Sequence, residues 1–126
     1  MAIQTADLGE GAEIASILDA AYLQVDTDDL RGAVERGDVL VAVADGSKKS
    51  GPILGVTVCD GREITAIAVR PGRRGQGIGT ELVAAVESRQ GRVVAEFDPT
   101  VRPFWESVGF EVTERPESER LRGVRE

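Results

Sequence analysis

The chain of 126 residues suits one domain with a single core, and a hydrophobic content of 41% is too high for a disordered chain. The net charge of −7 argues against a basic face for nucleic acid, and no apolar run reaches the ~20 residues that a membrane span needs. One cysteine and no histidine exclude an internal disulfide, histidine-based catalysis and the common zinc sites. No secretion signal is visible at the N-terminus. We therefore expect a single cytoplasmic domain over residues 1–126, without a metal and without membrane or nucleic-acid partners.

The basic residues are unevenly chosen, because lysine occurs only at Lys48 and Lys49 and all the others are arginine. An acidic, lysine-poor chain is typical of a halophilic cytoplasm, where net charge keeps proteins soluble. A GC-rich genome that favours arginine codons is the other explanation. Composition alone leaves both open.

Two helices are predicted near the N-terminus, after a short strand at residues 2–5. The first helix follows from apolar residues at helical spacing, which are Ile14, Ile17, Leu18, Ala21, Tyr22 and Val25. Asp26 to Asp29 interrupt that pattern and can cap a second helix, which Gly37 would end. The apolar side of this second helix consists of Leu30, Ala33 and Val34.

Three strands are predicted in the middle of the chain. Residues 39–44 form a continuous apolar run, which is typical of a strand buried on both faces. A loop over residues 45–52 separates it from a second strand at 53–59. The tight-turn pair Asp60-Gly61 then predicts an antiparallel third strand at 63–69, which Pro71 ends.

The C-terminal half alternates helices and strands. The expected elements are a helix at 76–90 closed by Gly91, a strand at 92–97, a short helix at 100–108 with Pro103 in its first turn, a strand at 109–114, and a final edge strand at 119–125. This order predicts an α+β fold with helices packed on a mixed sheet.

The glycine-rich segment from Arg73 to Thr80 carries the clearest chemical signal. Glycines at three alternate positions let backbone N–H groups approach a ligand, and the following helix adds the positive end of its dipole. Such a terminus binds phosphate groups. Thr80 stands where a G-x-G-x-x-G fingerprint needs its third glycine, and no Lys-Ser/Thr pair completes a P-loop. On these residues alone, a plain glycine-rich turn with solvated arginines remains an equal alternative.

Residues Ile64 to Leu82 resemble motif A of the GNAT (GCN5-related N-acetyltransferase) superfamily, in which an apolar strand leads through Val-x-Pro into Arg/Gln-x-x-Gly-x-Gly/Ala and a leucine-bearing helix. The matching positions are Val69, Pro71, Arg74, Gly77, Gly79 and Leu82. Residues Pro103 to Phe110 are similar to the Phe-Tyr-x-x-x-Gly-Phe signature of the same superfamily. Because both motifs occur in the right order and at a suitable spacing, the chain is identified as a member.

The resemblance implies an α/β three-layer fold of the α+β class, with a mixed, mostly antiparallel sheet, a splayed strand pair and helices on both faces. It also implies acetyl-CoA as co-substrate, wedged into the splay, with its pyrophosphate on the N–H groups of residues 74–80 and its pantetheine arm along residues 67–69. Asp98 is expected on the far side of this wedge, or as the cap of the following short helix. The implied cofactor-binding residues are Ile67, Ala68, Val69, Arg74, Gly75, Gln76, Gly77, Ile78, Gly79, Thr80 and Trp105.

The implied reaction is direct attack of a primary amine on the acetyl group in a ternary complex. The resemblance assigns the backbone N–H of Val69 to the thioester oxygen and makes Glu63 the candidate base, with a solvated Glu63 and deprotonation through water as alternatives. Trp105 stands where many relatives carry tyrosine, and an indole N–H can donate a hydrogen bond but is not a practical acid. The leaving thiol, with a pKa of about 8.5 if it resembles cysteine, can depart as thiolate.

The acceptor amine is expected to enter between the first two helices and the region of residues 100–110, as a small molecule or a protein amino group. Tyr22 is expected to pack on the core and Cys59 to be a buried small hydrophobe rather than a nucleophile. A homodimer is left open. Two other functions remain as alternatives: a non-catalytic acyl-CoA-binding module, and a phosphate- or nucleotide-binding domain of another kind.

Overall fold

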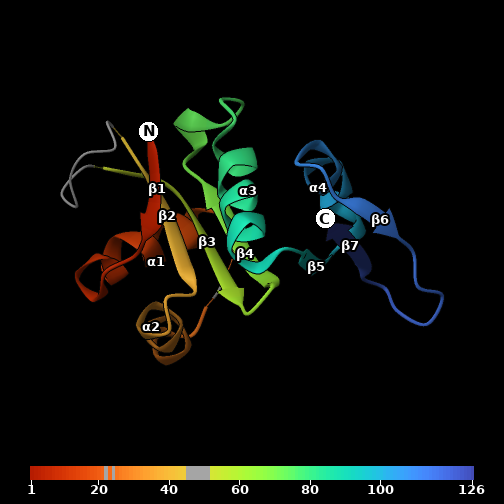
Figure 1. Cartoon of the computed structure of the whole chain (residues 1–126), viewed down its shortest axis with the longest axis horizontal. Coiled ribbons are helices and arrows are strands. Elements are labelled where there is room, and N and C mark those ends of the chain that lie inside the picture. The colour runs from red at the N-terminus through yellow and green to blue at the C-terminus, as the bar shows by residue number, and fades with distance from the viewer. Residues whose placement is uncertain (22, 24, 45–51) are drawn as a thin grey trace.

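The computed structural model describes residues 1–21, 23, 25–44 and 52–126. Its centre is a seven-stranded sheet with the order β1-β2-β3-β4-β5-β7-β6 (Figure 1). The strands are β1 (Ala2–Thr5), β2 (Val39–Val43), β3 (Ile53–Asp60), β4 (Glu63–Val69), β5 (Val93–Phe97), β6 (Glu111–Thr113) and β7 (Leu121–Arg125). The helices are α1 (Gly11–Ala20), α2 (Thr27–Glu35), α3 (Ile78–Gln90) and α4 (Arg102–Ser107). Only β4 and β5 pair in parallel, so the mixed, mostly antiparallel sheet is confirmed.

Helices cover both faces of this sheet, as expected. The odd-numbered residues of β2 belong to a core with α1 and α2, whereas Leu40 and Ala42 belong to a second core with α3 and α4. Every residue of β2 is therefore buried, which explains why its sequence shows no polar alternation.

The N-terminal elements agree with the sequence except at the end of α1. The helix ends at Ala20, because the N–H of Leu23 returns to the carbonyl of Leu18 at 2.9 Å and turns the chain away. Val25 therefore lies beyond the helix that its spacing suggested. Asp26 caps α2 by accepting from the N–H groups of Asp28 and Asp29, as predicted. Tyr22, with its expected packing, and the expected loop at 45–51 lie outside the described residues.

The last strand is not at the edge of the sheet, so that prediction was wrong. β7 lies between β5 and β6 and pairs antiparallel with both. It fits there because Gly123 has no side chain: a Cβ would stand 3.0 Å from the ring of Phe110 and 3.1 Å from that of Phe97. The short β6 forms the edge instead. The two arginines among the five residues of β7 hid its central place from the sequence.

Candidate active site

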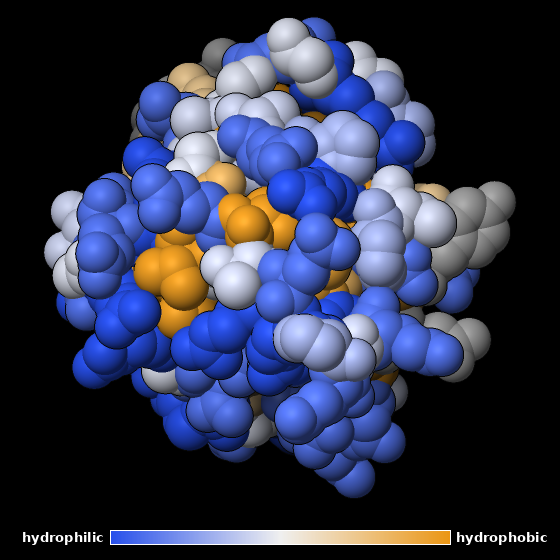
Figure 2. Space-filling model, turned by 90° about the vertical axis from the view of Figure 1, so that its right-hand side faces the viewer, coloured by the Kyte–Doolittle hydropathy of each residue, from blue (hydrophilic) through white to orange (hydrophobic). Residues whose placement is uncertain are grey.

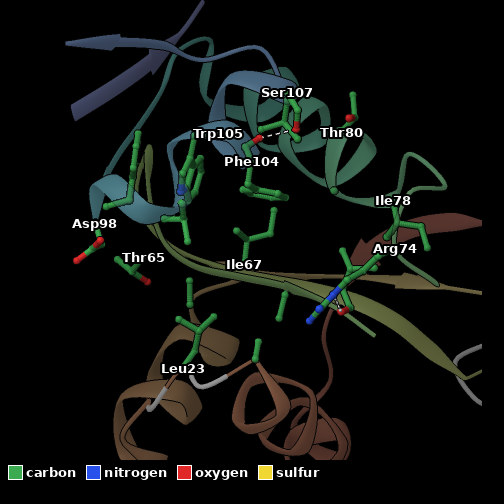
Figure 3. A pocket seen from close by; sticks show the side chains of 18 of the residues that line it. Leu23, Thr65, Ile67, Arg74, Ile78, Thr80, Asp98, Phe104, Trp105 and Ser107 are labelled. Carbon is green, nitrogen blue, oxygen red and sulfur yellow. Dashed lines mark hydrogen bonds between the residues drawn. The ribbon is translucent and has the colours of Figure 1, made fainter. Parts of the chain in front are cut away.

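A cleft opens where β4 and β5 separate. The two strands are in register only at Glu63 opposite Val94 and Ile64 opposite Ala95, and beyond this point they diverge. A bulge coincides with the divergence, since Cys59 pairs with Ile64 but Val58 already pairs with Ala66. The extra residue is Thr65, whose hydroxyl donates to the carbonyl of Val58 at 3.1 Å. The resulting cleft has a volume of about 680 Å³ (Figure 3).

The backbone of β4 presents one unpaired edge to this cleft. The N–H of Arg70 donates to the carbonyl of Leu54 in β3 at 2.9 Å. Because successive residues of a strand alternate their N–H and C=O groups between the two sides, Ile67 and Val69 direct theirs away from β3 and toward the splay. The carbonyl of Val69 accepts from Arg74 Nε at 3.3 Å on that side. The N–H groups of Ile67 and Val69 are thus oriented toward the space that β5 has left.

The glycine-rich loop follows β4 and leads into α3. Gly75 and Gly77 have φ angles of +79° and +82°, which only glycine adopts freely, and a Cβ at either position would meet no atom within 4 Å. Because the backbone of Gly77 is left-handed, α3 begins at Ile78. The sequence had suggested a start two residues earlier, at residue 76. No side chain caps this helix, so its first N–H groups stay available beside the open space left by the glycines.

Aromatic side chains form the opposite wall. Trp105 stacks on Phe97 with ring centroids 5.1 Å apart and meets Phe110 edge-on at 5.0 Å, which leaves it only 7% exposed. Phe104 lies next to it and is 37% exposed at the cleft. Both rings stand across the cleft from Ile67, and the indole nitrogen lies on the side toward Asp98 (Figure 3). Figure 2 looks onto the side that carries α4, β6 and β7 and shows apolar surface in the middle of this face, bordered by hydrophilic residues.

Charged side chains gather at the end of the cleft away from Arg74. Asp98 accepts from the N–H of Thr100 at 2.8 Å and so caps the 3₁₀ turn Pro99–Val101. Hydrogen bonds from the backbone and the side chain of Thr100, with a smaller contribution from the positive charge of Arg120, hold the pKa of Asp98 below its usual range. Glu96 and Arg120 line the cleft beside it. Asp98 therefore does both things considered for it: it caps the turn and lies at the far side of the cleft.

The cleft brings together nearly all of the residues expected to bind the cofactor. Those that line it are Ile67, Ala68, Val69, Arg74, Gly75, Gly77, Ile78, Gly79, Thr80 and Trp105, whereas Gln76 is not among its lining residues. Glu63 is also not among them, because it lies at the end of β4 that is still paired with β5.

The cleft also contains polar residues that the sequence did not predict there, among them Thr65, Glu96 and Arg120. Glu96 gave one signal, as a charged residue inside the apolar run of β5. Thr65 and Arg120 gave no signal in the sequence. The position of Thr65 depends on the bulge in β4, and that of Arg120 depends on the unexpected place of β7.

Cys59 lies outside the cleft. It borders a separate small void with Val86 and Arg89, and its side chain is buried. Burial raises the pKa of its thiol to about 11, so the thiol is protonated near neutral pH.

Among the residues described, no helix is long and apolar enough to cross a membrane.

The fold and the cleft define a class of protein, and the sequence as a whole matches it. Residues 9–124 match the model of the acetyltransferase (GNAT) domain, and the chain therefore belongs to that family. None of the curated proteins matches the chain significantly.

Solved structures with a similar fold include three whose ligands are relevant. N-acetylglutamate synthase from Neisseria gonorrhoeae, complexed with coenzyme A and N-acetyl-glutamate, is 20% identical with a TM-score of 0.73; the match covers 98% of this chain but only 34% of that one. The NatC complex bound to Gag peptide and CoA is 18% identical with a TM-score of 0.78, covering 98% and 96%. The protein yncA from Salmonella typhimurium, with its cofactor acetyl-CoA, is 21% identical with a TM-score of 0.68, covering 98% and 91%. At these identities the likeness concerns the fold.

Proposed function

We propose that this protein is an N-acetyltransferase that transfers the acetyl group of acetyl-CoA to a primary amine by direct attack in a ternary complex. The observation that carries the proposal is the open backbone edge of β4 beside the glycine-rich start of α3. One side of the cleft thus offers N–H groups for a peptide-like arm, and the next segment offers N–H groups for a phosphate. The CoA and acetyl-CoA ligands of the similar structures support the same cofactor here.

The residues of the cleft fit this cofactor. The pyrophosphate would lie on the N–H groups of residues 74–80, where side chains at Gly75 and Gly77 would otherwise fill the space. The amide groups of the pantetheine arm would pair with Val69. Phe104 and Trp105 would cover the arm from the opposite wall.

The chemical step needs a donor for the thioester oxygen and an acceptor for the amine proton. The N–H groups of Ile67 and Val69 both face the cleft from a rigid strand. Ile67 lies nearer the vertex of the splay, so its N–H is the proposed donor in place of that of Val69, which would bind the pantetheine arm. Glu63 is the proposed base, and because it does not line the cleft it would act through water from the paired end of β4. The thiol would leave as thiolate, since its pKa of about 8.5 needs no strong acid and Trp105 cannot supply one.

A non-catalytic acyl-CoA-binding module is the second candidate function. Two observations favour it: tryptophan replaces the tyrosine that many relatives carry at position 105, and Glu63 lies outside the cleft lining. Such a module would bind acetyl-CoA through the same backbone groups but release no thiol in the presence of any amine.

The deciding experiment is release of free CoA thiol from acetyl-CoA across a panel of amines, with CoA binding measured separately by calorimetry. The variant Cys59→Ala gives a protein without thiols and hence a clean background. Amine-dependent thiol release supports the enzyme. CoA binding without release for any amine supports the module, and no CoA binding contradicts both.

A further inference from the structure

Three arginine side chains cluster around Glu96 at the charged end of the cleft. The carboxylate of Glu96 forms ion pairs with Arg115 at 3.1 Å and with Arg122 at 3.9 Å. Arg120 donates from its guanidinium to the backbone carbonyl of Glu96 at 2.5 Å. Three arginines thus surround one glutamate, in a chain whose net charge is −7. The charge of Glu96 is thus neutralised, and the surplus arginine charge around it attracts anions.

Arg120 is held close to the point where the reaction would take place. The last paired residues of the splay are Ile64 and Ala95, and Glu96 is the next residue along β5. A strand advances by about 3.3 Å per residue, so the carbonyl that anchors Arg120 lies within one residue of the vertex of the splay. Thr65 lines the cleft from β4 just beyond the same vertex, and in Figure 3 Thr65 and Asp98 lie at the opposite end from Arg74.

The guanidinium of Arg120 has donors to spare. A guanidinium carries five N–H donors in a planar fork that matches a carboxylate. In the part of the chain that the structure describes, its side chain is bonded only to the carbonyl of Glu96, and the residue is exposed. Asp98 is near enough for the two charges to interact, yet it is not within ion-pair distance of Arg120. At this end of the cleft, the described residues therefore place the cation of Arg120, which has no ion-pair partner, beside the carboxylate of Asp98.

We propose that the acceptor is a small amino-carboxylate, such as a free amino acid, whose carboxylate binds Arg120 while its ammonium is attracted to Asp98 before deprotonation. The inference rests on the proposed function and names its acceptor class. The carboxylate lies only a few bonds from the amine, because Arg120 is anchored beside the vertex, about two residues along the splay from the Ile67 N–H that would hold the thioester. Asp98 suits the attraction of a cation rather than the removal of a proton, since its lowered pKa makes it a weak base.

The test compares amines that differ only in the carboxylate. Lysine and cadaverine, arginine and agmatine, and leucine and isoamylamine are assayed as pairs by thiol release. We expect the amino acid to exceed its decarboxylated partner at least tenfold in kcat/KM for the preferred side chain. Arg120→Ala should raise KM for the amino acid at least tenfold and abolish the preference, with KM for acetyl-CoA unchanged, and Arg120→Lys should restore part of it. The matched control is Arg36→Ala, an exposed arginine at the C-cap of α2 that does not line the cleft.

Three results would overturn the inference: decarboxylated amines used as well as amino acids, an unchanged preference in Arg120→Ala, or peptides with acidic side chains preferred to free amino acids. If CoA binds but no amine is acetylated, the proposed transfer fails, and the carboxylate site is decided by binding alone. Calorimetry then compares N-acetylated amino acids with N-acetylated amines on CoA-saturated protein. Binding of the amino-acid forms that Arg120→Ala loses supports the site, and no binding to the wild-type protein overturns it.

Discussion

The end of the cleft at α3 is built mainly from backbone, whereas the end at β5 is built from charged side chains. At the first end, glycines and the open edge of β4 expose N–H groups, and Arg74 is the main charge. At the second end, Glu96 lines the cleft from β5, Asp98 from the residue after β5, and Arg120 from the residue before β7. Backbone N–H groups suit a ligand that never changes, and side chains can vary with the acceptor. The difference assigns a constant cofactor to one end and a specific substrate to the other.

The largest effect is expected from breaking the backbone end with Gly77→Asp. The new carboxylate would project into the open space beside the start of α3, where it adds bulk and repels a phosphate. We expect CoA affinity to fall about 1,000-fold in calorimetry, equivalent to about 4 kcal/mol.

The matched variant is Gly77→Asn, which has the same shape without the charge and tolerates a positive φ better than most residues. It should retain more affinity than Gly77→Asp. Equal affinity of Gly77→Asp and the wild-type protein would contradict the placement of the pyrophosphate.

A second pair of variants separates folding from binding in the aromatic wall. Trp105→Ala removes a buried ring in contact with Phe97 and Phe110, and should lower the free energy of unfolding by about 3 kcal/mol in urea titration. Phe104→Ala removes a ring that is 37% exposed, so it should cost less stability while still weakening CoA binding. The reverse order of stabilities would show that Phe104, not Trp105, anchors the wall.

Glu63→Gln tests the vertex of the splay, which lies beside the charged end of the cleft. If Glu63 accepts the amine proton through water, kcat should fall by about tenfold at neutral pH and the acidic limb of the pH–rate profile should disappear. Glu35→Gln, at the end of α2, serves as the control for loss of one carboxylate. An unchanged profile would remove Glu63 as the base and leave deprotonation to water alone.

The smallest effect concerns Cys59, which lies at neither end. Cys59→Ala should leave acetyl transfer unchanged, because the thiol is buried outside the cleft. Its folded pKa of about 11 exceeds the ordinary thiol pKa of 9.0, so the unfolded thiol ionises first as the pH rises. The wild-type protein should therefore lose about 1 kcal/mol of stability between pH 8 and pH 10, and the variant should not. Urea titrations at the two pH values measure this; an equal loss in both proteins would contradict it.

The two ends also differ in how far the sequence predicts them. The backbone end depends on residues within one short segment, so Val69 and Gly77 could be placed from the strand, the proline and the glycine spacing. The charged end depends on a hydrogen bond between residues 24 positions apart, Glu96 and Arg120, which the insertion of β7 brings together. Local patterns do not encode that insertion. They also do not encode the bulge at Thr65, which is visible only in the pairing with β3.

The place of β7 also sets the order in which the cleft can be completed during synthesis on the ribosome. β1 to β4 and α3 all lie within the first 90 residues. The elements that form the backbone end of the cleft are therefore synthesised first. β5 can pair with β4 before β7 is made, but β6 pairs only with β7 among the strands described, so it cannot take its place until residues 121–125 leave the exit tunnel. The nascent chain thus acquires the half proposed to face the cofactor first and the half proposed to select the substrate last.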